Sequence, residues 1–205
     1  MSLNHRNWRK AADGRPGKLT RALFPTVAGV WLGFTPPALL GQSSTTPEYR
    51  MKASFLSNFA NFVEWPATAY SSPQTPLLIC VFGDFSFGTS LSESTRTITP
   101  HGRRAEARWV HKEQELHACQ ILFISHAEAK RYAKVLEVVR GESVLTVGET
   151  PNFLEAGGAV SFSFQQETLE FEINLGAVDG ARLKMSSRLL SLARRVVNKA
   201  GEAKS

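Results

Sequence analysis

The chain of 205 residues has few of the residue patterns on which enzymes depend. It contains no G-x-S-x-G nucleophile motif, no H-E-x-x-H zinc motif, no Walker loop and no G-x-G-x-x-G dinucleotide motif. It has two cysteines and five histidines, and none of them stand in H-x₃-H or C-x₂-C pairs. We therefore expect a protein that is not an enzyme and that holds neither a metal ion nor a cofactor.

The histidines give a faint indication of metal at most. His111 and His117 lie six residues apart, with Glu113 and Glu115 between them, which is wider than the usual spacing of metal ligands. We interpret them as solvated loop residues. The full set of histidines is His5, His101, His111, His117 and His126.

A long uninterrupted hydrophobic run is also missing. Residues 22–40 are apolar but are broken by three prolines and two glycines, whereas a membrane-spanning helix needs about 20 continuous apolar residues. Basic residues precede this stretch, and Gly41 and Ser43 offer a cleavage site. We predict a cleaved signal peptide at residues 1–43 and a single domain at 44–205. An uncleaved N-terminal anchor is the alternative.

The positive charge of the chain resides largely in this leader. The whole sequence has 24 Lys and Arg against 18 Asp and Glu, a formal net charge of +6. Six of the basic residues and one acid, Asp13, precede residue 44, which leaves 18 basic against 17 acidic residues in the predicted mature chain. A basic balance is the usual electrostatic indication of nucleic-acid binding, so we expect no nucleic-acid partner.

The two cysteines, Cys80 and Cys119, each fall in an apolar stretch that predicts a strand. In an exported chain two cysteines usually form one bridge, and the compartment favours that interpretation here. Two buried free thiols are the alternative, because cysteine is often buried without a partner. A bridge would also exclude a Cys–His nucleophile pair, because only the thiolate reacts.

Residues 49–66 carry the longest helical pattern of the predicted mature chain. Apolar side chains recur at spacings of three and four, and three phenylalanines widen the apolar stripe. Thr46 and Pro47 suit the N-cap and the first helical position. Pro66 predicts an end near Glu64, because proline disfavours the helical conformation in the preceding residue. We interpret this segment as a core helix.

The later segments alternate between strand and helix patterns. Strands are predicted at 77–82, 105–110, 119–125, 142–148, 158–164 and 168–174, with a short helix over 85–93, a helix over 126–139 and a final helix that begins near Ser186 or Ser187 and includes Val196, Val197 and Lys199. Helical crossovers favour parallel strands. We therefore predict an α/β fold, a three-layer domain with a mixed, partly parallel central sheet flanked by helices, and a C-terminal hairpin and helix.

Such a sheet predicts a crevice at the carboxyl ends of its strands. The residues that follow the three parallel strands are Gly83, Asp84, Ser125, His126 and Glu149. A small ligand in this crevice is one interpretation. Turn and cap residues, which every such fold requires, are the interpretation that we favour.

Three aromatic residues near strand ends are candidates for a partner surface: Phe85, Phe87 and Trp109. Exposed aromatic side chains often anchor protein contacts, and equally often cover a core. Both interpretations stay open for these three residues.

Five stretches of the chain carry a family resemblance. They are Lys52–Pro66 (K-A-x-F-L-x-N-F-A-N-F-V-E-W-P), 77–84 (LLICVFGD), 118–125 (ACQILFIS), 144–149 with 153–162 (VLTVGE and FLEAGGAVSF), and 169–174 with 186–193 (LEFEIN and SSRLLSLA). In this order they resemble the YfiR-like family of periplasmic proteins over nearly all of the predicted mature chain. The residues taken as the signature core are Phe59, Trp65, Pro66, Gly157, Gly158, Phe171 and Asn174.

The resemblance implies a periplasmic, non-catalytic regulator. Its best-known role is to repress an inner-membrane diguanylate cyclase, which keeps cyclic di-GMP and biofilm output low. An outer-membrane lipoprotein partner, redox control and homodimers are also implied. Cys80 and Cys119 match positions where the family carries a bridge. Some members have a further cysteine pair near residues 153–162, and this chain has none there.

Two other functions remain beside the regulator. A periplasmic small-molecule binding or sensor protein is the alternative, because related domains also serve as sensory inputs. A hydrolase ranks third, because it would need a catalytic constellation that the sequence does not contain.

Overall fold

A seven-stranded mixed sheet forms the centre of the structure, a computed structural model that describes residues 45–198. The predicted signal peptide at 1–43 lies outside the described residues. Neighbouring strands are parallel except β6 and β7, which form an antiparallel hairpin. In sheet order the strands are β3 (Ala105–Val110), β2 (Leu77–Phe82), β4 (Ile121–Ile124), β5 (Leu145–Gly148), β6 (Val160–Gln165), β7 (Thr168–Asn174) and β9 (Arg195–Val197).

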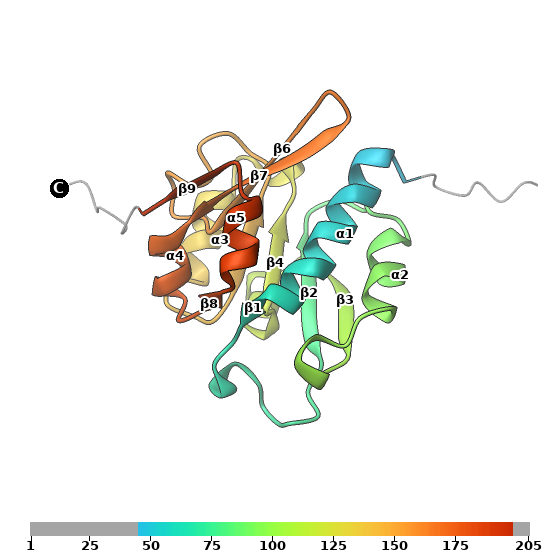
Figure 1. Cartoon of the computed structure of the whole chain (residues 1–205), viewed down its shortest axis with the longest axis vertical. Coiled ribbons are helices and arrows are strands. Elements are labelled where there is room, and N and C mark those ends of the chain that lie inside the picture. The colour runs from blue at the N-terminus through green and yellow to red at the C-terminus, as the bar shows by residue number, and fades with distance from the viewer. Residues whose placement is uncertain (1–44, 199–205) are drawn as a thin grey trace, which may run out of the picture. The chain divides into compact units, whose positions relative to one another are not determined.

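Helices cover both faces of this sheet, which gives the three layers expected from the sequence and confirms the fold class. One face carries α1 (Pro47–Phe62), α2 (Ser90–Arg96), α4 (Leu175–Gly180) and α5 (Ser187–Leu192), and the other carries α3 (Tyr132–Val138) and the 3₁₀ helix η3 (Glu113–Ala118). Figure 1 shows α1 in front of the sheet, with α2 beside it. Shorter elements are β1 (Val63–Glu64), β8 (Lys184–Met185), η1 (Ala67–Ala69), η2 (Pro100–Gly102) and η4 (His126–Glu128).

The order of the strands places a topological switch point between β2 and β4. From β2 the chain crosses through α2 to β3 on one side, whereas from β4 it crosses through α3 to β5 on the other side. Right-handed crossovers that run in opposite directions put their helices on opposite faces, as found here. Ligand crevices in such sheets lie beyond the strand ends at this point.

Two separate hydrophobic clusters form the core, because successive side chains of a strand point to opposite faces. Leu77, Ile79 and Val81 of β2 face α1, while Leu78, Cys80 and Phe82 face the α3 side. On the α1 side a group of aromatic rings fills the space between helix and hairpin: Phe55, Phe59, Phe162 and Phe171 lie with ring centroids 5.4–6.4 Å apart. Edge-to-face and stacked contacts of this kind add to the free energy of burial.

The disulfide that the exported setting favours is present in the structure. Cys80 in β2 bonds to Cys119, just before β4, with a Cα–Cα distance of 5.8 Å. Both cysteines are buried on the α3 side of the sheet. The bond joins neighbouring strands on either side of the switch point and closes a sequence separation of 39 residues, which is worth roughly 3 to 4 kcal/mol in the chain-entropy model.

Helix α1 begins as its sequence predicts. Thr46 is the N-cap, and its hydroxyl accepts a hydrogen bond from the Tyr49 N–H at 3.4 Å. The helix ends at Phe62, two residues before the predicted end, because Val63 and Glu64 pair with β8. Trp65 then donates its indole N–H to the carbonyl of Gln120 at 3.1 Å, which fixes the exit from the helix.

Two of the signature residues, Gly158 and Asn174, occupy a packing position and a capping position. A Cβ atom on Gly158 would clash with the Phe153 ring, and one on Gly148 would clash with the same ring from the other side. Asn174 caps α4 by accepting from the Ala177 N–H at 3.4 Å, and its amide donates to the Leu154 carbonyl at 3.2 Å. These glycines and this asparagine hold the connection between β5 and β6 against the sheet.

The C-terminal end differs from the prediction. The last helix, α5, stops at Leu192, and Arg195–Val197 form strand β9 beside β7. The predicted helix over 126–139 is also shorter, because 126–128 form a 3₁₀ turn and α3 covers only Tyr132–Val138. Within residues 45–198 no helix is long and apolar enough to span a bilayer.

Candidate functional site

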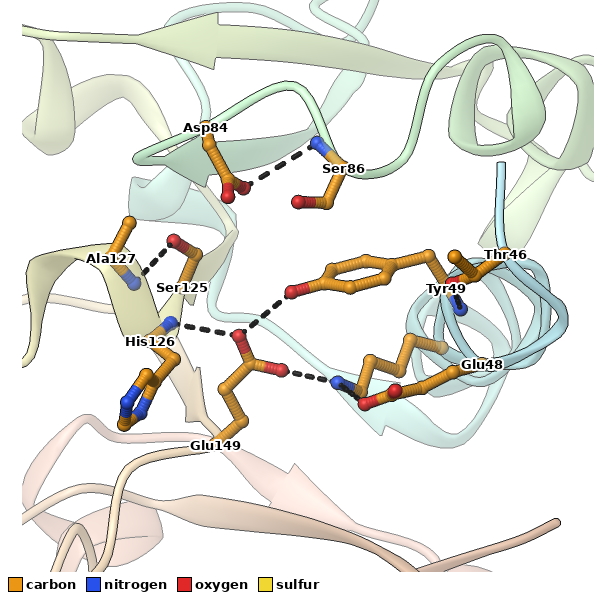
Figure 2. Close-up of polar contacts among 10 residues, drawn as sticks. Thr46, Glu48, Tyr49, Asp84, Ser86, Ser125, His126, Ala127 and Glu149 are labelled. Atoms are coloured by element: carbon orange, nitrogen blue, oxygen red, sulfur yellow. Dashed lines mark hydrogen bonds and ion pairs between the residues drawn. The ribbon is translucent and has the colours of Figure 1, made fainter. Parts of the chain in front are cut away.

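The carboxylate of Glu149 is the centre of a polar cluster at the carboxyl ends of β4 and β5. Its Oε1 atom accepts from the His126 main-chain N–H at 2.7 Å and from the Tyr49 hydroxyl at 3.1 Å. Figure 2 shows these contacts converging from three segments of the chain. The side chain of Glu149 is 7% exposed, so its charge is almost removed from water.

Lys52 neutralises that charge. Its ammonium group forms ion pairs with Glu149 and, one helical turn back, with Glu48. The Lys52 side chain is 3% exposed. A buried charge of this kind is stable only when it is paired and hydrogen-bonded. The cluster therefore fastens the first turns of α1 to the end of the sheet.

The surroundings of Tyr49 favour its neutral form. Burial, followed by the nearby negative charge of Glu149, raises the pKa of the Tyr49 phenol well above its ordinary value. The ring also packs edge-to-face on Phe87, with centroids 5.1 Å apart. Tyr49 thus serves as a hydrogen-bond donor to Glu149 and as part of the core.

Four of the five predicted crevice residues come together here. A Cβ atom on Gly83 would clash with the Ser125 hydroxyl, which accepts from the Ala127 N–H at 3.2 Å and caps the turn of His126. The main-chain N–H of His126, the first residue of this turn, donates a hydrogen bond to Glu149. Asp84 is exposed and accepts from the Ser86 N–H at 3.4 Å as a local turn. The side chains of α1 occupy the space directly above Glu149.

A cavity of about 590 Å³ lies beside this cluster. It extends from Tyr49 and Lys52 past the loop after β5 to strand β6, and it ends at Arg194 and Arg195. The cavity exists because β5 stops at Gly148 while β6 continues to residue 165. Its volume suits a small organic molecule.

Two polar features belong to residues that line this cavity. The Thr150 hydroxyl is buried and has no hydrogen-bond partner among the residues that the structure describes. At the far end Glu172 binds both arginines: it pairs with the Arg194 guanidinium and accepts from Arg195 Nε at 2.9 Å. Both arginines remain about half exposed, so each still presents N–H donors to the solvent.

Among residues 45–198 no group of three or more His, Cys, Asp or Glu side chains is placed to hold a metal ion. The two loop histidines have different neighbours. His117 Nδ1 lies 2.6 Å from Glu142 Oε1, and the centroid of the His111 ring lies 6.1 Å from that of the Phe85 ring. The described residues thus combine a buried, ion-paired polar cluster, a cavity beside it and a disulfide.

Comparison with protein families decides the relationship. A model of the YfiR/HmsC-like family matches residues 49–194. The chain belongs to the YfiR/HmsC-like family. Members of this family are periplasmic regulators rather than catalysts.

Two solved structures match this YfiR/HmsC-like chain at low sequence identity. The ABC domain from Streptococcus pneumonia, solved in complex with L-Trp, is 11% identical with a TM-score of 0.50, and the match covers 71% of this chain and 60% of that one. A conserved domain protein from Vibrio cholerae is 10% identical with a TM-score of 0.46, over 72% and 60%. The chain thus spans about three fifths of the length of either structure, and the first likeness concerns the fold alone.

The three aromatic residues proposed as a partner surface separate in this family member. Phe87 is fully buried, packs on Phe123 with ring centroids 5.0 Å apart, and is excluded from any surface. Phe85 is 65% exposed and stacks on Trp109 at 5.8 Å with an interplanar angle of 16°. The loop turns between Phe85 and Phe87, so one ring faces solvent and the other enters the core.

Lys52, Tyr49, Thr150 and the two C-terminal arginines are site residues that sequence reasoning missed. Lys52 and Glu149 are 97 residues apart, and no local pattern connects them. A lysine inside the buried stripe of an amphipathic helix was the available signal, because such a charge requires a partner.

Proposed function

We propose that this chain is a periplasmic regulatory protein that represses an inner-membrane diguanylate cyclase by binding its periplasmic region. Residues 1–43 serve as a removed signal peptide in this proposal, and residues 44–205 form one regulatory domain. Loss of the contact releases cyclic di-GMP synthesis and biofilm formation. Release involves an outer-membrane lipoprotein, as the family resemblance implies.

The family match over residues 49–194 carries this proposal. The bridge between Cys80 and Cys119 supports export to an oxidising compartment. The polar cluster at Glu149 supports a binding role, since its charged groups are paired with each other rather than free to act as a nucleophile or base.

The exposed ring of Phe85, supported from below by Trp109, is the contact that we propose for the cyclase. Rigid aromatic side chains at the centre of an interface contribute much of the binding free energy. Phe85 and Trp109 are stacked almost in parallel, so the ring is held in place before a partner binds. An ordered ring loses less conformational entropy on binding.

Deletion of the gene tests the role directly. Cyclic di-GMP should rise in the deletion strain and fall again when the gene is restored. Unchanged cyclic di-GMP in both oxidising and reducing medium would reject repression of a cyclase. A membrane pull-down with the wild-type protein should recover an inner-membrane signalling protein.

Variants of the aromatic loop test the surface separately from the role. Phe85→Ala should weaken recovery of the membrane partner without changing the melting temperature, because the ring is 65% exposed. Phe87→Ala is the matched control and should lower the melting temperature, because that ring is fully buried. Full recovery with Phe85→Ala would reject this surface and leave the repressor role standing.

A periplasmic small-molecule binding or sensor protein is the second candidate, and the cavity beside Glu149 favours it. The N–H groups that Arg194 and Arg195 still present at one end of this cavity would supply hydrogen bonds to such a ligand. Native mass spectrometry of the purified protein should then show a bound small molecule, and Arg194→Ala should lose it. A ligand-free protein that recovers a membrane cyclase would reject this candidate.

A further inference from the structure

Residues 162–165 of strand β6 extend beyond the end of its neighbour β5. The two strands pair only at Val147 with Val160 and at Gly148 with Ser161. Farther along, no strand in the described part of the chain lies on this side of β6. Figure 1 shows the β6–β7 hairpin projecting past the ends of the parallel strands. The sheet therefore has an open edge in its interior, separate from its two outer strands.

The cavity beside Glu149 runs along this open edge. Residues 161–164, which are consecutive in β6, all line it. Successive side chains of a strand point to opposite faces, so a cavity on one face would meet only alternate residues. Contact with consecutive residues places the cavity beside the strand, in the space that a longer β5 would occupy.

The antiparallel hairpin determines which main-chain groups of β6 face the cavity. The Asn174 N–H donates to the Ala159 carbonyl at 2.8 Å, and these two residues extend the register of β6 and β7 by one pair. Hydrogen-bonded pairs alternate with non-bonded pairs along such a ladder. The main-chain groups of the odd-numbered residues of β6 therefore face β7, while those of Phe162 and Phe164 face the other way, toward the cavity.

Three of these main-chain groups have no partner within residues 45–198. The N–H of Phe162 is engaged where Gly148 pairs with Ser161, at the last pair of β5 and β6. The C=O of Phe162 and the N–H and C=O of Phe164 have no strand opposite them and no other main-chain partner in that range. A row of unpaired N–H and C=O groups is a template for a further strand.

A strand that runs parallel to β6 matches these three groups. Its first residue donates its N–H to the Phe162 C=O and accepts from the Phe164 N–H, and its third residue donates to the Phe164 C=O. An antiparallel strand would instead set one of its C=O groups against the Phe162 N–H, which is already engaged with β5. The main chain therefore favours the parallel direction.

Such a strand has to begin with its own N-terminus. Its first residue lies opposite Ser163 in the parallel register. The positions before it belong to this chain, because Gly148 lies opposite Ser161 and Glu149 follows. A longer segment on that side would overlap the end of β5.

The charge of the cavity also favours a free amino group. Four carboxylates and three cationic side chains line it, a formal net charge of −1 when histidine is counted as neutral. The carboxylates are those of Glu48, Glu149, Glu155 and Glu172, and the cations are those of Lys52, Arg194 and Arg195. One positive charge restores the balance, and an α-ammonium group supplies it.

We propose that this cavity binds the free N-terminal segment of an extended polypeptide, which adds to β6 as a parallel strand in line with β5. Main-chain hydrogen bonds supply the affinity, and capture of the amino group selects a chain terminus. The second side chain of the segment lies beside Phe164 on the α1 side, so an apolar residue is favoured there. Gln165 and Gln166 are exposed, so the chain can leave to solvent after its third residue.

The proposal gives the second candidate function its class of ligand, and it rests on that cavity rather than on the cyclase contact at Phe85. A peptide added to the purified protein tests it apart from the gene deletion and apart from any ligand that copurifies. The probe is Ser-Val-Ser amide with a free amino group. In an NMR titration the Phe164 amide should shift and saturate, with a Kd of about 1 mM or below.

Two modified peptides test the terminus. The N-acetyl form of the probe should bind at least about tenfold more weakly, because it lacks the charge and its added group would meet the end of β5. The probe lengthened at its C-terminus by six Gly and Ser residues should bind within about threefold of the original. A larger loss would restrict the site to short peptides and would overturn the assignment to a polypeptide.

Variants of Phe164 test the main-chain contact. Phe164→Pro removes an N–H that points away from β7, so the hairpin keeps its own hydrogen bonds. It should bind the probe at least about tenfold more weakly than Phe164→Ala, which also lacks the ring but keeps the N–H. Glu48→Gln should weaken binding roughly threefold, because the net charge of the lining rises to zero. Similar melting temperatures of Phe164→Pro and Phe164→Ala would show that both fold.

Three results would overturn the proposal. One is a Phe164 amide that does not shift at about 10 mM probe. Another is an N-acetyl peptide that binds as well as the free one. The third is equal binding by folded Phe164→Pro and Phe164→Ala, or shifts confined to the outer strands β3 and β9, because the peptide would then lie elsewhere.

Discussion

Replacing Lys52 by methionine should destabilise the protein by about 3 kcal/mol. Methionine keeps most of the volume of the side chain, so the main change is the loss of the ammonium group from the buried cluster. Glu149, whose side chain is 7% exposed, then loses its ion pair inside the protein. Removal of one partner of a buried ion pair typically costs about 3 to 5 kcal/mol.

The structure places the expected cost at the low end of that range. Glu149 keeps two hydrogen bonds after the change, from the Tyr49 hydroxyl and the His126 N–H. Glu48 is one-third exposed and can be solvated at little cost. For a domain of this size a loss of about 3 kcal/mol lowers the melting temperature by about 6 to 12 °C.

Urea unfolding of five proteins measures the effect: wild type, Lys52→Met, Glu149→Gln, Glu48→Gln and the double variant Lys52→Met with Glu149→Gln. Glu48→Gln is the matched control and should cost under about 1 kcal/mol, because Lys52 keeps its pair with the buried Glu149. Lys52→Met combined with Glu149→Gln should be more stable than Lys52→Met alone, because the unpaired carboxylate is then a neutral amide. The reasoning fails if the free energy of unfolding of Lys52→Met lies within about 0.5 kcal/mol of the wild-type value. It also fails if the double variant loses as much unfolding free energy as the two single variants together.

Three further predictions follow from packing, pH and redox state. Gly158→Ala should cost about 2 to 3 kcal/mol in urea unfolding, because its methyl group would enter the Phe153 ring, while Gly180→Ala meets no atom within 4 Å and should change stability by less than about 1 kcal/mol. Above about pH 10 the unfolded chain releases the proton of Tyr49, whereas the folded chain keeps it because the pKa of this phenol is raised. The free energy of unfolding should therefore fall as pH rises in wild type, and fall less steeply in Tyr49→Phe. Equal slopes would contradict the raised pKa. Replacing both cysteines by alanine should cost roughly 3 to 4 kcal/mol, and an unchanged unfolding midpoint in reductant would contradict this.

Strands with strong local patterns were predicted at their observed bounds. Residues 77–82, 105–110 and 168–174 each form a strand with the predicted ends. The first is apolar throughout and buried on both faces, while the other two alternate. In the two alternating strands the side-chain pattern matches the period of a strand, and in all three the flanking prolines, glycines or charged residues mark the ends.

The C-terminal segment shows why local pattern fails elsewhere. Val196 and Val197 continue the helical spacing of α5, and the sequence therefore predicts one long helix. In the structure the adjacent Arg195 binds the buried Glu172 of β7, and the segment completes the sheet as β9. A tertiary ion pair and a free sheet edge outweigh helix propensity, which is worth only tenths of a kcal/mol per residue.

Helix α4 was missed for a different reason. Its six residues include two glycines, which lower helix propensity. The N-cap Asn174 was a local signal that could have marked its start. The polar cluster at Glu149 and the cavity beside it have no such local signal, because they join α1 to segments about 75 or more residues further along the chain.

The position of the disulfide predicts which strands of the central sheet separate first when the bond is reduced. Between β2 and β4 no short crossover links the two strands, since the chain leaves one for β3 and reaches the other only after η3. This boundary separates two halves of the sheet that each form from nearby segments of the chain. The disulfide from Cys80 to Cys119 is the covalent link across it. In a reducing environment the amide protons of β2 and β4 should therefore become the first of the central strands to exchange with solvent, while the β6–β7 hairpin, closed by its own turn, keeps its protection.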